Sequence, residues 1–271
     1  MTKIIDVLNK KLDNPNSKYN DKEIKWLISH IGDPDSDIRD ALVCNTFGSG
    51  FFDQKFTREQ AKHLFETVQQ KNLLFYQIPK KLPYTLTRSF TCLLLELIIL
   101  VNGKSDSKYY QILCTKDELA TFDSLIKYLE LENDYTGYSN KYGWVHSVAH
   151  CSDALEICIK QNSFDQKLAT RLLMASQNMF LHVNKRFIDE EEYHLADVFI
   201  AGIKRSKFSS NDLIQWFDLF DFNLESLNRI DFYRFCNLKS FAEDIYVKLN
   251  TDNLLNNKLA KYIEEKFSQK Y

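Results

Sequence analysis

Helix-start signals recur about every twenty residues along this chain, and this spacing constrains the fold more than any other feature. The segments Thr57 to Gln60 and Thr115 to Glu118 have the capping-box pattern, in which Thr is followed three positions later by Glu or Gln. Asp33 before a proline and the run Ser209 to Asp212 are also typical of helix starts. No segment has the pattern of a strand hairpin. The chain is therefore expected to consist of helices.

Turn-forming residues are scarce, which strengthens this expectation. The 271 residues include only 7 glycines and 4 prolines, whereas an all-β chain draws on both for its many turns. The apolar periodicity predicts helices over residues 3–12, 21–31, 36–50, 57–75, 84–101, 115–131, 143–160, 164–183, 190–205, 210–220, 226–248 and 252–269.

We predict an all-α fold in which about twelve helices form a single domain over residues 1–271. Helices of this length with short connections commonly stack as antiparallel pairs, which gives an α/α superhelix, a solenoid of the HEAT or armadillo kind. Because the sequence contains no strict internal repeat, a compact globular helical bundle is the alternative.

Charge and apolar segments limit the classes of partner. The formal net charge is −2 with acids and bases mixed along the chain, so we expect no nucleic-acid partner. The longest apolar run, Cys92 to Val101, is interrupted by Glu96 and is too short to span a bilayer, so we expect no membrane partner. The N-terminus lacks the apolar run of a signal peptide, and the 6 cysteines include no CxxC pair. These features predict a cytoplasmic protein with reduced thiols.

His146, His150 and Asp153 form the clearest candidate site. In the helix expected over 143–160 they stand at positions i, i+4 and i+7, which places them on one strip of its surface. The apolar residues of this helix fall on the opposite face, which is expected to pack in the core. In a superhelix the polar strip would line the concave groove, where ligands commonly bind.

This strip allows three interpretations. Two neutral imidazoles at i and i+4 can bind one divalent cation, with Asp153 as a ligand or an orienting group. Without a metal, a histidine beside a carboxylate is a suitable general base. The three side chains can also serve only to join neighbouring helices. Because two imidazoles alone hold a metal weakly, His146 and His150 are weak metal candidates, and we expect no tightly bound metal or other cofactor.

Five further residues are candidates for ligand binding. Arg88 lies in an apolar helix and needs an acidic partner, and Glu132 and Asp134 end the helix that precedes the histidine strip. Either these charges form salt bridges between helices, or Arg88 and Asp134 meet near the histidines as the wall of a polar pocket. Trp144 precedes the strip, and His194, in the acid-rich start of a later helix, is expected to reach a shared groove.

Several short blocks occur in a recognisable order. They are Arg39-Asp40, Thr87-Arg88-Ser89-Phe90, Glu132-Asn133-Asp134 leading to Gly137-Tyr138, and Gly143-Trp144-Val145-His146 followed by Ala149-His150 and Asp153. Over roughly residues 35 to 200 this order resembles an uncharacterised bacterial family, catalogued as domain of unknown function 2785. The resemblance implies a helical bacterial protein and carries no assigned activity. The chain departs from the family pattern at Cys151-Ser152, where a Gly-Ala pair is expected, and at Thr136 and His194, where arginines are expected.

Two functional classes remain. The first is a helical-repeat scaffold or binding module whose polar groove around His146, His150 and Asp153 holds a small molecule, a peptide or a protein segment. The second is an enzyme, such as a hydrolase, that uses the histidine pair as general base or metal ligands. The sequence contains no nucleophile elbow, phosphate-binding loop or dense metal motif, which favours the first class.

Overall fold

The computed structural model describes residues 2–224 and 229–267 and confirms the all-α prediction. The α-helices are α1 (Thr2–Leu12), α2 (Asp21–Ser29), α3 (Asn45–Phe52), α4 (Arg58–Gln70), α5 (Tyr84–Asn102), α6 (Thr115–Leu131), α7 (Ser147–Ile159), α8 (Gln166–His182), α9 (Glu191–Lys204), α10 (Ser210–Phe217), α11 (Ile230–Thr251) and α12 (Asn257–Phe267). A π-helix, η1 (Asp37–Cys44), a 3₁₀-helix, η2 (Leu73–Phe75), and two short strands, β1 (Tyr138–Ser139) and β2 (Gly143–Trp144), complete the described elements.

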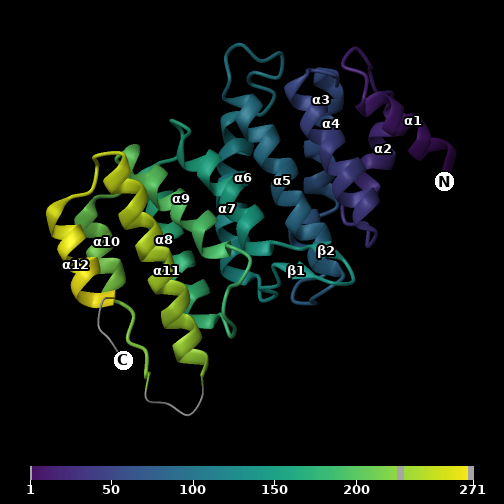
Figure 1. Ribbon diagram of the computed structural model, residues 1–271. Coiled ribbons are helices and arrows are strands. Elements are labelled where there is room, and N and C mark those ends of the chain that lie inside the picture. The colour runs from purple at the N-terminus through teal and green to yellow at the C-terminus, as the bar shows by residue number, and fades with distance from the viewer. Residues whose placement is uncertain (1, 225–228, 268–271) are drawn as a thin grey trace.

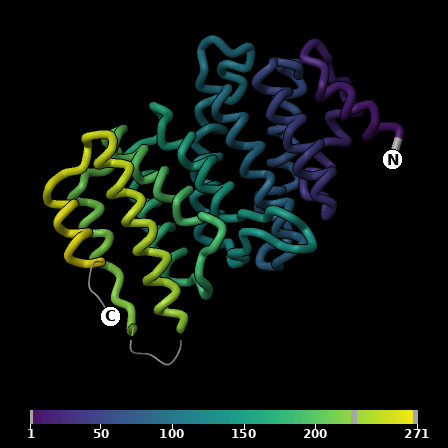
Figure 2. The backbone as a smooth tube through the Cα atoms, in the orientation of Figure 1, coloured from purple at the N-terminus to yellow at the C-terminus, as the bar shows by residue number. Residues whose placement is uncertain are grey.

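The helices follow one another across the molecule, from α1 at one end to α12 at the other (Figure 1). Helix α7 packs between α5 and α9, and α9 packs in turn between α7 and α11. Helices α6 and α8 pack against each other, α6 also contacts α7, and α8 also contacts α11. The tube view shows the same progression of helices (Figure 2). The neighbouring helices α5, α7 and α9 carry most residues of the candidate functional site.

The sequence predicted capping boxes at Thr57 and Thr115 and a helix start at Ser209, and the structure shows a different outcome at Thr115. Thr57 and Ser209 each form a complete capping box. The capping box expected at Thr115 is wrong, because Cys114 is the N-cap of α6 and makes no side-chain cap. The Glu118 carboxylate of that pattern instead accepts hydrogen bonds from Asn102 and from Ser163, at 2.9 and 2.5 Å. A long-range contact has therefore replaced the local one.

The helix predicted over 143–160 begins later than expected, at Ser147. Gly143 has a φ of +71° and His146 a φ of +44°, and left-handed residues cannot continue an α-helix. Residues 143–144 instead pair antiparallel with 138–139 and form a small hairpin. The sequence pattern did not predict this hairpin. His146 therefore lies at the N-cap of α7 rather than inside the helix, although the His150 N–H still donates to its carbonyl at 2.9 Å, as in the first turn of a helix.

Two other predicted helices are divided. The segment 36–50 consists of η1 followed directly by α3. The segment 57–75 ends as an α-helix at Gln70, and a left-handed Asn72 with φ +49° separates it from η2. The helix predicted over 226–248 is observed as α11, and its expected first residues lie outside the described residues.

Helix α5 runs through the core. It spans 19 residues and, among the described residues, is the one helix long and apolar enough to cross a membrane by length and composition. Most of its apolar window is buried inside the protein, as is usual for a core helix. Its Arg88 is fully buried and pairs with Glu132 at 2.8 Å. The apolar helix is thus longer than the run Cys92 to Val101.

Candidate functional site

The hairpin β1–β2 is held in place by Arg39, a fully buried residue of η1. Its guanidinium donates to the backbone carbonyls of Tyr142 and Trp144, at 2.5 and 3.1 Å. It also pairs with Asp40 at 2.8 Å, and it lies 4.7 Å from the ring centroid of Phe90. π-Helical turns are often found at functional sites. The position of Arg39 on η1 therefore marks the hairpin that it anchors as part of a candidate site.

The start of α9 holds the other side of the hairpin. The Asp189 carboxylate accepts a hydrogen bond from the backbone N–H of Tyr138 at 3.0 Å. Gly137 allows this close approach, because a Cβ there would lie 2.0 Å from Glu191 Oε1 and 2.3 Å from Asp189 Oδ2. The Gly137 carbonyl accepts from the N–H groups of the two residues before α7, Val145 and His146. The hairpin thus links the first turns of α7 and α9.

Three imidazoles meet at this place, and we refer to His146, His150 and His194 as the histidine cluster. The ring centroid of His146 lies 5.5 Å from that of His150 and 6.1 Å from that of His194. The rings come from the residue before α7, from α7 and from α9. The structure therefore brings together the two histidines of the predicted strip and the histidine two helices later in the chain.

The Nδ1 atom of each ring faces a side chain of the protein. His194 Nδ1 lies 2.6 Å from Asp153 Oδ1, and His150 Nδ1 lies 2.8 Å from Ser89 Oγ. The Ser89 hydroxyl donates to the Val145 carbonyl, so its oxygen accepts from His150 Nδ1–H. In the neutral ring this tautomer leaves the lone pair on Nε2.

His146 faces a carboxylate but does not form a hydrogen bond with it. Its Nδ1 lies 3.9 Å from Glu191 Oε1, and both atoms are buried and form no hydrogen bond to the described residues. Two unsatisfied buried polar atoms that face each other are uncommon, because each loses its hydration without compensation. A shift of roughly 1 Å would join them in a hydrogen bond. Glu191 is thus placed to orient the His146 ring.

The Nε2 atoms of the histidine cluster are open. They form no hydrogen bond with the described residues, and none of them is among the buried polar atoms that lack a partner. Each Nε2 therefore keeps some contact with solvent, although the His150 ring as a whole is largely buried. Rings held through Nδ1 with Nε2 free are the arrangement by which histidines present a base, a hydrogen-bonding group or a metal ligand.

The pKa values of the three rings are shifted in different directions. The hydrogen bond to Asp153 raises the pKa of His194 above its ordinary value, although burial opposes it. Burial lowers the pKa of His146, and the charge of His194 lowers it further. Burial, together with the neighbouring imidazoles, lowers the pKa of His150 well below its ordinary value. One ring thus favours the cation and two favour the neutral form, so the cluster offers both an acid and bases.

A fourth titratable group, Glu96 of α5, lies in the same electrostatic environment. Burial raises its pKa to about 7, and the negative charges of Asp153 and Glu156 add to this effect. The charge of His194 acts on Glu96 in the opposite sense. A carboxyl group that titrates near neutral pH beside a histidine is a common property of functional sites.

Exposed aromatic rings border the histidine cluster. Trp144 is 47% exposed and stacks on His146, with ring centroids 4.4 Å apart and an angle of 8° between the planes. Tyr138 is 49% exposed and contacts Trp144 edge to face at 5.0 Å. Large aromatic side chains with half of their surface in solvent are available for stacking by a ligand.

A protein metal site usually needs three or more donor side chains at one place. Within residues 2–224 and 229–267, no group of three or more His, Cys, Asp or Glu side chains is arranged to hold a metal ion. Asp153 is engaged by His194 rather than directed at His146 or His150.

Arg88, Glu132 and Asp134 form a separate buried network. The Arg88 guanidinium donates to both Glu132 carboxylate oxygens, at 2.8 and 2.9 Å. The Asp134 carboxylate accepts from the hydroxyl of Thr85 at 2.6 Å, and Thr85 also accepts from Arg88 at 3.2 Å. All four side chains are buried. This arrangement is a salt bridge between helices, and ligand binding by these residues stays a prediction.

Several residues of the site could not be recognised in the sequence. Ser89 bonds to the His150 ring and Glu191 faces the His146 ring, each from another element, and Tyr138 reaches Trp144 only through the hairpin. Glu191 belongs to an acid-rich segment for which the helix dipole is a sufficient explanation. Arg39 carried one signal, a charged residue within an apolar segment that required a buried partner.

Comparison with known proteins identifies one family. The sequence model of the family described as "Protein of unknown function (DUF2785)" matches residues 74–247, which is more than half of the chain. This segment contains β1, β2, α7 and α9 and therefore all three members of the histidine cluster. No curated protein and no solved structure matches the chain.

Proposed function

The chain belongs to the DUF2785 family, and we propose that it is a helical binding module that holds a small molecule or a peptide segment against the histidine cluster. The proposal includes an α/α superhelical arrangement in which α5, α7 and α9 present the site on their shared face. Its principal support is the set of three open Nε2 atoms, because these atoms can donate and accept hydrogen bonds at one place.

The exposed ring of Trp144 and the charge of His194 indicate the chemical class of such a ligand. A planar or aromatic group can stack on Trp144, whose other face rests on His146. A carboxylate on the same ligand can accept a hydrogen bond from His194, the ring that favours the cation. The ligand class is therefore a small molecule or peptide that combines a planar group with a carboxylate.

Thermal unfolding in the presence of aromatic dipeptides and aromatic carboxylic acids tests this proposal. A ligand is expected to raise the midpoint of wild-type protein and to lose most of this effect in Trp144→Ala and His194→Ala. The matched control is Trp26→Ala, which removes a tryptophan that stacks on His30 at 3.9 Å in α2. If every stabilising compound acted equally on the site variants, or if none stabilised the wild type, the proposal would be wrong.

A hydrolytic enzyme is the second candidate, and the His194–Asp153 pair favours it. A carboxylate bonded to Nδ1 fixes the tautomer of a histidine and raises its pKa, so the deprotonated ring is a stronger general base for the activation of water. With p-nitrophenyl acetate as the substrate, a hydrolase of this kind should lose about a hundredfold or more of its kcat/KM in His194→Ala. His182→Ala, at the exposed end of α8, is the control. Equal rates in wild type and His194→Ala would exclude this candidate.

A further inference from the structure

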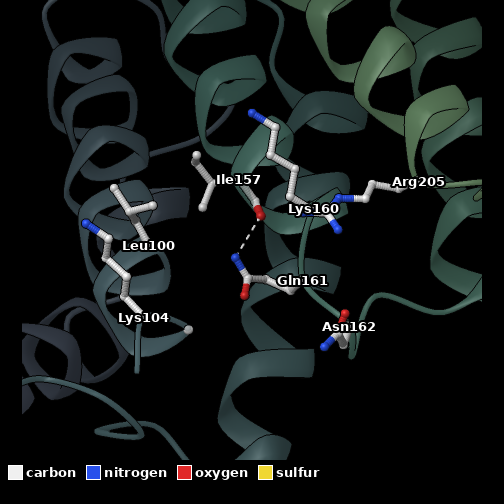
Figure 3. A pocket seen from close by; sticks show the side chains of 8 residues that line it. Leu100, Lys104, Ile157, Lys160, Gln161, Asn162 and Arg205 are labelled. Carbon is white, nitrogen blue, oxygen red and sulfur yellow. Dashed lines mark hydrogen bonds between the residues drawn. The ribbon is translucent and has the colours of Figure 1, made fainter. Parts of the chain in front are cut away.

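A second polar site lies at the opposite ends of the same helices. A pocket of about 400 Å³ is formed where α5, α7 and α9 end, and it is lined by Leu100, Gly103, Lys104, Ile157, Lys160, Gln161, Asn162 and Arg205. Figure 3 shows Leu100 and Lys104 on one wall and Arg205 reaching towards the end of α7 from the other. This volume falls in the range of pockets that hold small organic ligands.

The charge of the lining is wholly positive. Lys104, Lys160 and Arg205 are its ionisable residues, and no carboxylate lines the pocket. Among the described residues Lys104 and Arg205 form no ion pair, whereas Lys160 pairs with Glu156 at 2.6 Å. The Arg205 guanidinium is exposed and can bind two oxygen atoms of one anion.

The nearby carboxylates are already engaged. Asp252 pairs with Lys204 at 2.7 Å, and Asp197 pairs with Lys248 at 2.8 Å. Glu156 and Asp197 line an adjoining pocket with Lys160 and Arg205, but each already pairs with a lysine, Glu156 with Lys160 at 2.6 Å and Asp197 with Lys248. Lys104 and Arg205 are thus the cations of the pocket that have no paired carboxylate among the described residues, and an anion can balance them.

Polar and apolar groups complete the lining. The Gln161 amide donates to the Ile157 carbonyl at 3.1 Å, and its oxygen lies against Gly103, where a Cβ would approach it to 2.3 Å. The absence of a side chain at Gly103 thus allows this wall to close. The exposed Asn162 amide adds donors, and Leu100 and Ile157 add apolar surface. Such a lining suits an anion that also has a carbon skeleton.

We infer that this pocket binds a small organic anion through Lys104, Lys160 and Arg205, with a phosphate or carboxylate group as the recognised chemistry. The site is separate from the histidine cluster, because His150 and Lys160 stand ten residues apart on α7, which is roughly 15 Å along the helix axis. The inference therefore does not depend on the function proposed for the cluster.

Cations also occur at helix ends for a purely local reason, because they offset the helix dipole. The chain offers a matched control for this effect. Lys71 is an exposed cation at the C-cap of α4, as Arg205 is at the C-cap of α9, and it lines none of the described pockets. Lys71→Gln thus removes a helix-end cation without altering the pocket.

Calorimetric titration with sodium pyrophosphate and with sodium citrate at low ionic strength tests the inference. Saturable binding of at least one probe is expected, and the double variant Lys104→Gln, Arg205→Gln should weaken it about tenfold or more. Lys71→Gln and His194→Ala should bind as the wild type does. The preferred probe distinguishes a phosphate site from a carboxylate site.

Amide chemical shifts of the wild-type protein give a second measurement that does not depend on any variant. Titration with the bound probe should shift the amide signals of Gly103, Gln161 and Asn162 more than those at the histidine cluster. The inference is overturned if neither probe binds saturably, if the double variant binds as tightly as the wild type, or if the shifts centre elsewhere. Equal weakening by Lys71→Gln would also overturn it, since it would indicate general charge attraction.

Discussion

His194 Nδ1 and Asp153 Oδ1 lie 2.6 Å apart and join α9 to α7. This contact makes His194 the ring of the histidine cluster with a raised pKa, whereas burial lowers the pKa of the other two. The different protonation states therefore follow from one carboxylate and from the depth of each ring. The site depends on contacts between helices rather than on spacing within one helix.

Replacement of Asp153 by asparagine tests this assignment. Asp153→Asn removes the negative charge next to His194, so the pKa of His194 should fall, because its main stabilising partner for the cation is lost. A proton NMR titration of the imidazole signals measures this change. The imidazole signal of His182, at the end of α8, serves as the internal reference. An unchanged His194 pKa would show that the contact does not form in solution.

The buried ring of His150 should make the protein sensitive to acid. Its pKa is lowered when the chain folds, so the unfolded chain takes up a proton at higher pH than the folded protein does. Stability should therefore be lost as the pH falls through about 6.5. In His150→Gln, the free energy of unfolding in urea should decrease less steeply between about pH 7.5 and 5.5. Parallel pH profiles for the two proteins would contradict this prediction.

The effect of Glu96 has the opposite sign. Its pKa is raised from 4.5 to about 7, so the folded protein holds a proton that the unfolded chain has lost, and stability falls as the pH rises through this interval. At about pH 8, Glu96→Gln should be more stable than the wild type by roughly 1–3 kcal/mol, with little difference at about pH 4.5. Urea unfolding at both values measures this, with the exposed Glu66→Gln as the control. A gain that did not depend on pH would rule out the buried carboxylate as its source.

Gly137 should be intolerant of even a methyl group. Gly137→Ala would place a Cβ against Glu191 and Asp189, two carboxylates held at the start of α9, so one of them must move. We expect a loss of about 1–3 kcal/mol in unfolding free energy and a shifted His146 imidazole signal. Gly48 of α3 is the matched control, because a Cβ there meets nothing within 4 Å. Gly48→Ala should be neutral or stabilising by about 0.5–1 kcal/mol. Similar results for both variants would contradict the predicted crowding at Gly137.

The sequence predicted the helical class because helix periodicity and the scarcity of turn residues are local properties. The capping box at Thr57 and the helix start at Ser209 formed as expected for the same reason. At Thr115 the expected box did not form, because Glu118 was engaged by Asn102 and Ser163 from other segments. Local patterns thus failed where a tertiary contact offered a better partner.

The sequence indicated which histidines lie near one another, but not how their side chains are arranged or which residues contact them. His146 and His150 are adjacent, although a left-handed His146 and the hairpin replace the helical strip from which their adjacency was predicted. The partners Ser89 and Glu191 come from α5 and α9, and no spacing in the sequence encodes these pairings. Predicting them requires the order in which helices pack, which periodicity does not supply.

Because Arg39 anchors the hairpin, a shortened protein without Arg39 would lose part of the support of the histidine cluster. The segment that defines the family begins at residue 74, whereas Arg39 precedes it and donates to the carbonyls of Tyr142 and Trp144. A fragment restricted to residues 74–247 would leave both carbonyls without this donor, and it would uncover the sides of α5 on which α3 and α4 pack. The N-terminal helices therefore act as an intramolecular clamp on a site whose histidines all lie elsewhere in the chain.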